Sequence, residues 1–132
     1  MTIERQAVHV ATKSGEPRGI QVTEESFDPS GLAVTVRGEL DIATAPALRD
    51  RLNEAIDAGT YRFVIDLSAV SFLDSVALAT IVHAKQRLPE KGRMAIATEP
   101  DSYVTLIFES SGLANVLDIV GTRAEAIEHA SA

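Results

Sequence analysis

Residues 63–78 read FVIDLSAVSFLDSVAL, and two periodicities meet within them. Residues 63–67 are partly β-branched and apolar except for Asp66, which is typical of a strand covered on both faces. From Ser75 the apolar side chains recur at helical spacing until Pro89 and Gly92, residues that end helices. The pattern predicts a strand over 63–67, a polar corner, and a helix from Ser75 to about residue 88.

The polar corner supplies either Asp74 or Ser75 as the cap of this helix, because the oxygen of a cap side chain accepts from free backbone N–H groups. The same N–H groups and the helix dipole, equivalent to about half a charge, favour an anion. Two interpretations of Ser75 therefore stay open. It is an ordinary capping residue, or its hydroxyl is placed to carry a phosphate.

Composition excludes several kinds of site. The chain of 132 residues is expected to form one domain, and it has no cysteine for disulfides, zinc–thiolate sites or thiol catalysis. Its three histidines are scattered without metal-ligand spacing, so neither a metal nor another cofactor is expected. The net charge of −7 argues against direct binding of nucleic acid.

No stretch approaches the ~20 apolar residues that span a bilayer, and the first residues lack the apolar core of a signal peptide. We therefore expect no membrane association and a cytoplasmic location.

The rest of the chain predicts a mixed α/β fold. Two alternating segments, 20–27 and 32–38, flank the turn sequence DPSG and predict a hairpin. The other predicted elements are a helix from Thr44 or Ala45 to Gly59, a strand at 93–97, a helix at 101–110, a short strand at 115–119 and a helix at 122–129 that opens with a capping box.

These elements predict a single domain at 20–132, with a mixed sheet of four to five strands and about four helices joined by right-handed crossovers. Residues 1–19 are expected to be a flexible extension with one marginal strand at 7–11. In such sheets ligands and partners meet the carboxyl ends of the parallel strands. Asp41, Asp74 and Ser75 are predicted to lie at that edge.

A serine hydrolase is one function to weigh for Ser75. Such a serine needs a base within reach and usually a G-x-S-x-G elbow, whereas no glycine lies within three residues of Ser75. His83 lies two turns further along the predicted helix, too far to act easily as the base. We therefore do not expect an enzyme.

Three motifs carry a resemblance to a known family: GELD at 38–41, VIDLSAVSFLDS at 64–75 and SGL at 111–113. Together they look like the signature of STAS domains, specifically of bacterial anti-sigma factor antagonists, over residues 20–130. The resemblance implies that an anti-sigma factor with serine kinase activity is the partner, that its capture releases a sigma factor, and that phosphorylation of Ser75 prevents this capture. A serine phosphatase would be a second partner.

The family pattern has Asp-Ser, then Ser or Thr, then Gly-Leu, whereas this chain has Val76 and Ala77 at the third and fourth positions. The resemblance places Asp41, Asp74, Ser75, Val76 and Ala77 at the partner surface, and the added Cβ of Ala77 is expected to narrow it. The alternative is a STAS scaffold without a switch, or an accessory subunit of a signalling or lipid-transport complex.

Several conspicuous residues have plainer expected roles. Asp66 is expected to be a hydrogen-bonded structural carboxylate, because a buried charge is costly unless it is paired. Glu24, Glu25 and Glu39 are expected to be solvated, and residues 106–108 are expected to lie in the core.

Overall fold

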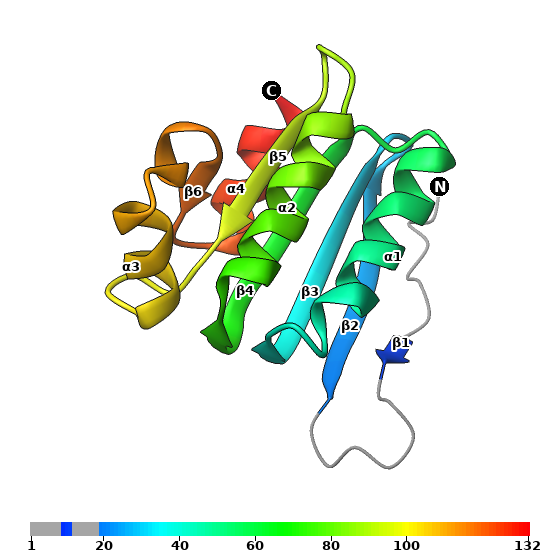
Figure 1. Cartoon of the computed structure of the whole chain (residues 1–132). Helices are drawn as coiled ribbons and strands as arrows, with labels where there is room; N and C mark the ends of the chain where they lie inside the picture. Colours follow the sequence, from blue (N-terminus) through cyan, green and yellow to red (C-terminus); the bar gives the residue numbers. More distant parts are fainter. Residues whose placement is uncertain (1–8, 12–18) are drawn as a thin grey trace.

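The computed structural model describes residues 9–11 and 19–132, which form a six-stranded sheet in the order β1-β2-β3-β4-β5-β6 (Figure 1). Strands β1, β2 and β3 pair antiparallel, and β3 to β6 pair parallel. The predicted mixed sheet is confirmed. The strands are β1 (His9–Ala11), β2 (Ile20–Asp28), β3 (Gly31–Leu40), β4 (Arg62–Leu73), β5 (Arg93–Ala97) and β6 (Asp118–Val120).

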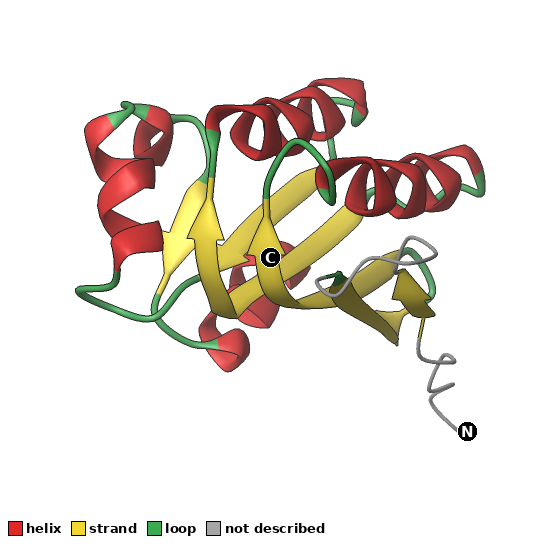
Figure 2. Cartoon of the chain, turned by 60° about the horizontal axis from the view of Figure 1, so that its bottom comes forward, coloured by secondary structure: helices red, strands yellow, loops and turns green. Residues whose placement is uncertain are grey.

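Helices cover both faces of this sheet. Because β3 to β6 follow one another in order, right-handed crossovers place the three connecting helices on one face, and α4 packs on the other (Figure 2). The helices are α1 (Ala45–Asp57), α2 (Ser75–Arg87), α3 (Tyr103–Ser110), the short 3₁₀ helix η1 (Leu113–Asn115) and α4 (Arg123–Ser131).

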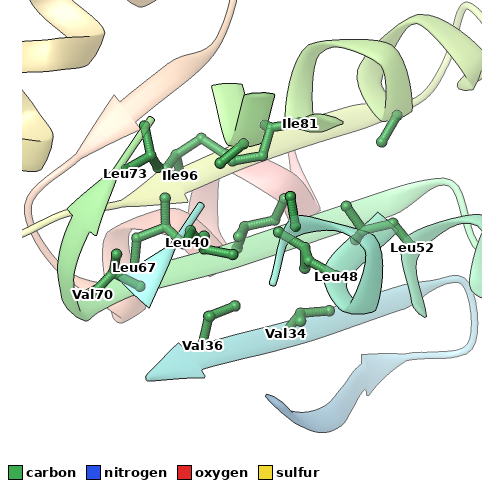
Figure 3. Packing of buried hydrophobic residues seen from close by; sticks show 14 of the residues in the cluster. Val34, Val36, Leu40, Leu48, Leu52, Leu67, Val70, Leu73, Ile81 and Ile96 are labelled. Carbon is green, nitrogen blue, oxygen red and sulfur yellow. The ribbon is translucent and has the colours of Figure 1, made fainter. Parts of the chain in front are cut away.

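Alternation along β4 divides the interior into two cores. Phe63, Ile65 and Leu67 pack with α1, α2 and α3, whereas Val64 faces α4. Figure 3 shows the first core, in which strand residues such as Val34 interdigitate with side chains from the helices. The second core is built mainly from alanines, which let α4 approach the sheet closely: Ala33, Ala95, Ala97, Ala126 and Ala130.

The hairpin, the strand at 93–97 and the four helices form as predicted. Thr122 is the N-cap of α4, because its hydroxyl accepts from the N–H of Glu125 and donates to the Glu125 carboxylate. Strand β4 is longer than expected and runs to Leu73. Its second half pairs only with the end of β3, across two irregularities in register. Residues 1–8 and 12–18, where the flexible extension was expected, lie outside the described part, while residues 9–11 pair with β2.

A strand was predicted at 115–119, and its predicted first residue is wrong. The N–H groups of Val116 and Leu117 donate to the carbonyl of Leu113, which makes the 3₁₀ turn η1 and leaves no N–H there for a ladder with β5. Strand β6 therefore begins only at Asp118.

Two side-chain expectations are also wrong. Glu24 is buried, because it points inward in phase with Ile20 and Val22, and it forms an ion pair with Arg51. Leu106 is 58% exposed, because Val104 and Phe108 set the buried face of α3 and Leu106, two residues from each, points to the opposite side of the helix. Asp66 is buried and accepts from Ser68, as expected.

Candidate functional site

Asp74 joins the two loops that follow the carboxyl ends of β3 and β4. One carboxylate oxygen accepts from the backbone N–H of Ala77 at 3.0 Å, which makes Asp74 the N-cap of α2. The other oxygen accepts from the N–H of Ile42 at 3.0 Å, in the loop before α1. The backbone N–H of Asp74 donates to the carbonyl of Leu40. Of the two capping candidates, Asp74 is therefore the cap, and it holds both loops in one corner.

Asp41 organises the other half of this corner. Its carboxylate accepts from the N–H groups of Ala43 at 2.9 Å and Thr44 at 3.0 Å. The hydroxyl of Thr44 donates to the carbonyl of Glu39 at 2.6 Å, which closes the loop. Gly38, with φ +114°, precedes it, and a Cβ there would lie 2.9 Å from the carbonyl oxygen of Gly19. The GELD motif thus encodes a tight loop that leads into α1.

Ser75 is the first residue of α2 and is exposed. Among the described residues its hydroxyl has no hydrogen-bond partner, unlike the carboxylate of its neighbour Asp74. The N–H groups of Ala77 and Leu78 are bonded to Asp74, which leaves those of Ser75 and Val76 at the surface. A free hydroxyl therefore lies at the positive end of a helix of 13 residues.

The next two residues have opposite environments. Val76 is 38% exposed beside Ser75, whereas Ala77 is fully buried against the first core. The Cβ of Ala77 points away from the surface, so the expectation that it narrows the approach of a partner does not hold. The side chains of Asp41, Asp74, Ser75 and Val76 form the accessible corner.

Two exposed apolar side chains, those of Ile42 and Phe72, lie beside the corner, and neither was among the residues expected at the partner surface. Ile42 is 71% exposed in the loop held by Asp74, and Phe72 is 39% exposed three residues before Ser75. Phe72 stacks on Tyr103, with ring centroids 6.0 Å apart and an angle of 11° between planes. A signal was available, because Phe72 and Val76 flank the predicted polar corner.

In the part of the chain that the structure describes, no three His, Asp or Glu side chains gather as metal ligands would. Within the same part, no helix is long and apolar enough to cross a membrane.

The fold and this corner define a small α/β domain that presents a free serine at a helix start. A family model for the STAS domain matches residues 21–126, and the chain belongs to the STAS domain family.

Other proteins resemble this chain in sequence or in fold. The chain is 35% identical over 76 residues to the anti-sigma-F factor antagonist RsfB of Mycobacterium tuberculosis, a match that covers 57% of this chain and 62% of RsfB, less than two thirds of that relative. The crystal structure of an anti-sigma factor antagonist from Mycobacterium paratuberculosis superposes with a TM-score of 0.80 at 26% identity, covering 89% of this chain and 98% of the other.

The phosphorylated form of SpoIIAA, a Bacillus cell fate determinant, superposes with a TM-score of 0.63 at 21% identity, covering 81% of this chain and 96% of that one. At that identity the match shows the shared fold. The two mycobacterial proteins, RsfB and the protein of the crystal structure, are anti-sigma factor antagonists by name.

Proposed function

We propose that this protein is an anti-sigma factor antagonist that binds an anti-sigma factor with serine kinase activity, releases a sigma factor, and loses its affinity when Ser75 is phosphorylated. The observation that carries the proposal is the exposed Ser75, whose hydroxyl is unbonded among the described residues, at the start of α2. The names of the relatives support the partner class. The protein acts by binding in the cytoplasm, and a serine phosphatase restores the active form.

The fold accommodates a phosphate on Ser75. The modification adds about −1.5 to −2 charges, and the N–H groups and dipole at the start of α2 favour negative charge there. Because the hydroxyl has no bond to lose among the described residues, phosphorylation removes no internal contact of Ser75. The domain therefore stays folded.

The interface does not accommodate the phosphate. A partner that covers Ser75 also covers the exposed side chains of Ile42 and Val76, so the phosphate would be desolvated next to apolar groups and the carboxylate of Asp74. A desolvated, unpaired charge costs ~3 kcal/mol or more, which weakens affinity by roughly a hundredfold. The switch thus acts on binding and leaves stability unchanged.

Calorimetric titration against each purified serine-kinase anti-sigma factor of the source genome tests the proposal. Wild type and Ser75→Ala should bind equally, Ser75→Asp should bind roughly a hundredfold more weakly, and all three should melt at similar temperatures. Ser131→Asp is the matched control, because it makes the same change at an exposed serine of α4, the helix on the opposite face of the sheet, and it should bind like wild type.

Equal affinity of Ser75→Asp and wild type would leave a STAS scaffold without a switch. Absence of binding by every form would leave an accessory subunit of another complex as the better description.

A further inference from the structure

The face around the corner continues onto α3, where exposed apolar side chains lie outside the motif that contains Ser75. Tyr103 is 48% exposed and Leu106 is 58% exposed, and they lie three residues apart, which places them on the same side of the helix. The ring of Tyr103 stacks on Phe72, which belongs to β4 immediately before the corner. We call Phe72, Tyr103 and Leu106 the α3 patch.

The α3 patch adjoins the corner that contains Asp74 and Ser75. Strand β4 ends at Leu73, so Phe72, which belongs to the α3 patch, lies only two residues before the capping residue Asp74. Figure 1 shows the start of α3 at the same end of the sheet as the arrowheads of β3 and β4. Monomeric proteins seldom expose neighbouring large apolar side chains without using them to bind. The α3 patch therefore extends the surface that begins at Ile42 and Val76.

The charges at this end of the molecule select the partner. Segments 38–48, 68–84 and 98–108, which build the corner and the α3 patch, contain five carboxylates and no Lys or Arg. Basic residues flank these segments in the chain: Arg37 precedes the first, and Arg49 and Lys85 follow the first and the second. Arg123 is bonded to Glu25 and Thr35 of β2 and β3. Two copies of this chain facing each other here would bring like charges together, which disfavours self-association.

We propose that the α3 patch is a second anchor for the anti-sigma factor, and that the partner meets it with an apolar surface rimmed by Lys and Arg. The inference rests on the proposed function and adds the part of the surface that lies beyond Ser75. Stacked and apolar side chains supply affinity, and the acidic rim speeds association and selects a basic partner.

The first test is titration of Tyr103→Ser and Leu106→Ser against the same purified serine-kinase anti-sigma factors. Each change should weaken binding by about tenfold or more, as loss of an interface anchor does. The matched control is Val116→Ser, which also removes an exposed aliphatic side chain, 54% exposed, but lies ahead of β6, beyond the opposite end of α3. Because Tyr103, Leu106 and Val116 are all exposed, the three variants should have melting temperatures close to that of wild type.

The second test separates the charge effect. Glu99→Lys should slow association several-fold at physiological salt, whereas Glu90→Lys, an identical change between α2 and β5 at the other end of the sheet, should not.

The outcomes distinguish the two proposals. If wild type binds and Ser75→Asp does not, but both α3 variants bind like wild type, the α3 anchor is refuted and the switch stands. If wild type self-associates and Leu106→Ser is monomeric, a second copy occupies the α3 patch and the proposal fails. If wild type binds no serine-kinase anti-sigma factor, both proposals fail.

Discussion

Replacing Asp74 tests whether one carboxylate holds the corner together. In Asp74→Ala the N–H of Ala77 loses its cap, which costs about 1 kcal/mol, and the N–H of Ile42 loses a charged acceptor, which costs about as much again. For 132 residues the entropy of unfolding is about 0.28 kcal/mol/K, so a loss of about 2 kcal/mol lowers Tm by about 7 °C.

Two further variants should lose less stability than Asp74→Ala. Asp74→Asn keeps a single good acceptor for two donors, so it should lose about half as much, about 1 kcal/mol. Ser75→Ala removes a hydroxyl that has no bond among the described residues and should stay within about 0.5 kcal/mol of wild type.

Urea denaturation followed by circular dichroism measures all three variants, and differential scanning calorimetry gives Tm. The expected order of stability is wild type and Ser75→Ala, then Asp74→Asn, then Asp74→Ala. A loss in Ser75→Ala equal to that in Asp74→Ala would refute the assignment of Asp74 as the cap, and with it the separation between a structural aspartate and a free serine.

Three further predictions concern other parts of the molecule. Ala77→Gly should destabilise the domain by about 1 to 2 kcal/mol in urea melts, because it removes a buried methyl group and adds backbone freedom within α2; unchanged stability would mean that the Cβ is not packed. Arg51→Met should cost about 3 kcal/mol, since it leaves the buried carboxylate of Glu24 unpaired, whereas Arg49→Met, whose arginine is exposed and pairs with the adjacent Asp50, should cost at most about 0.5 kcal/mol. A hydrogen bond with Ser30 and the nearby ammonium of Lys91 lower the pKa of Tyr61. In Tyr103→Phe, which leaves Tyr61 as the single tyrosine, ultraviolet absorbance should therefore show phenolate forming at a pH below the usual tyrosine range. Adding Lys91→Met should move this titration to higher pH, and an unmoved curve would contradict the contribution of Lys91.

The sequence by itself determined the order of elements and the position of the serine. Apolar runs bounded by turn residues are local signals, so the strand at 93–97 and the helix that begins at Ser75 could be predicted closely. The motifs at 38–41 and 64–75 also placed Asp41 and Asp74 at one edge, because parallel strands end together. The strand, helix and loop patterns could be predicted because each depends on residues only a few positions apart in the sequence.

Only the tertiary structure decided which side chains share a surface. The burial of Glu24 depends on Arg51, 27 residues away, and the extension of β4 to Leu73 depends on a partner strand with an irregular register. The exposure of Leu106 and the stacking of Tyr103 on Phe72 follow from how α3 is rotated against the sheet. Such contacts join residues far apart in the chain, and the periodicity of one segment indicates its secondary structure but does not identify the residues that it contacts.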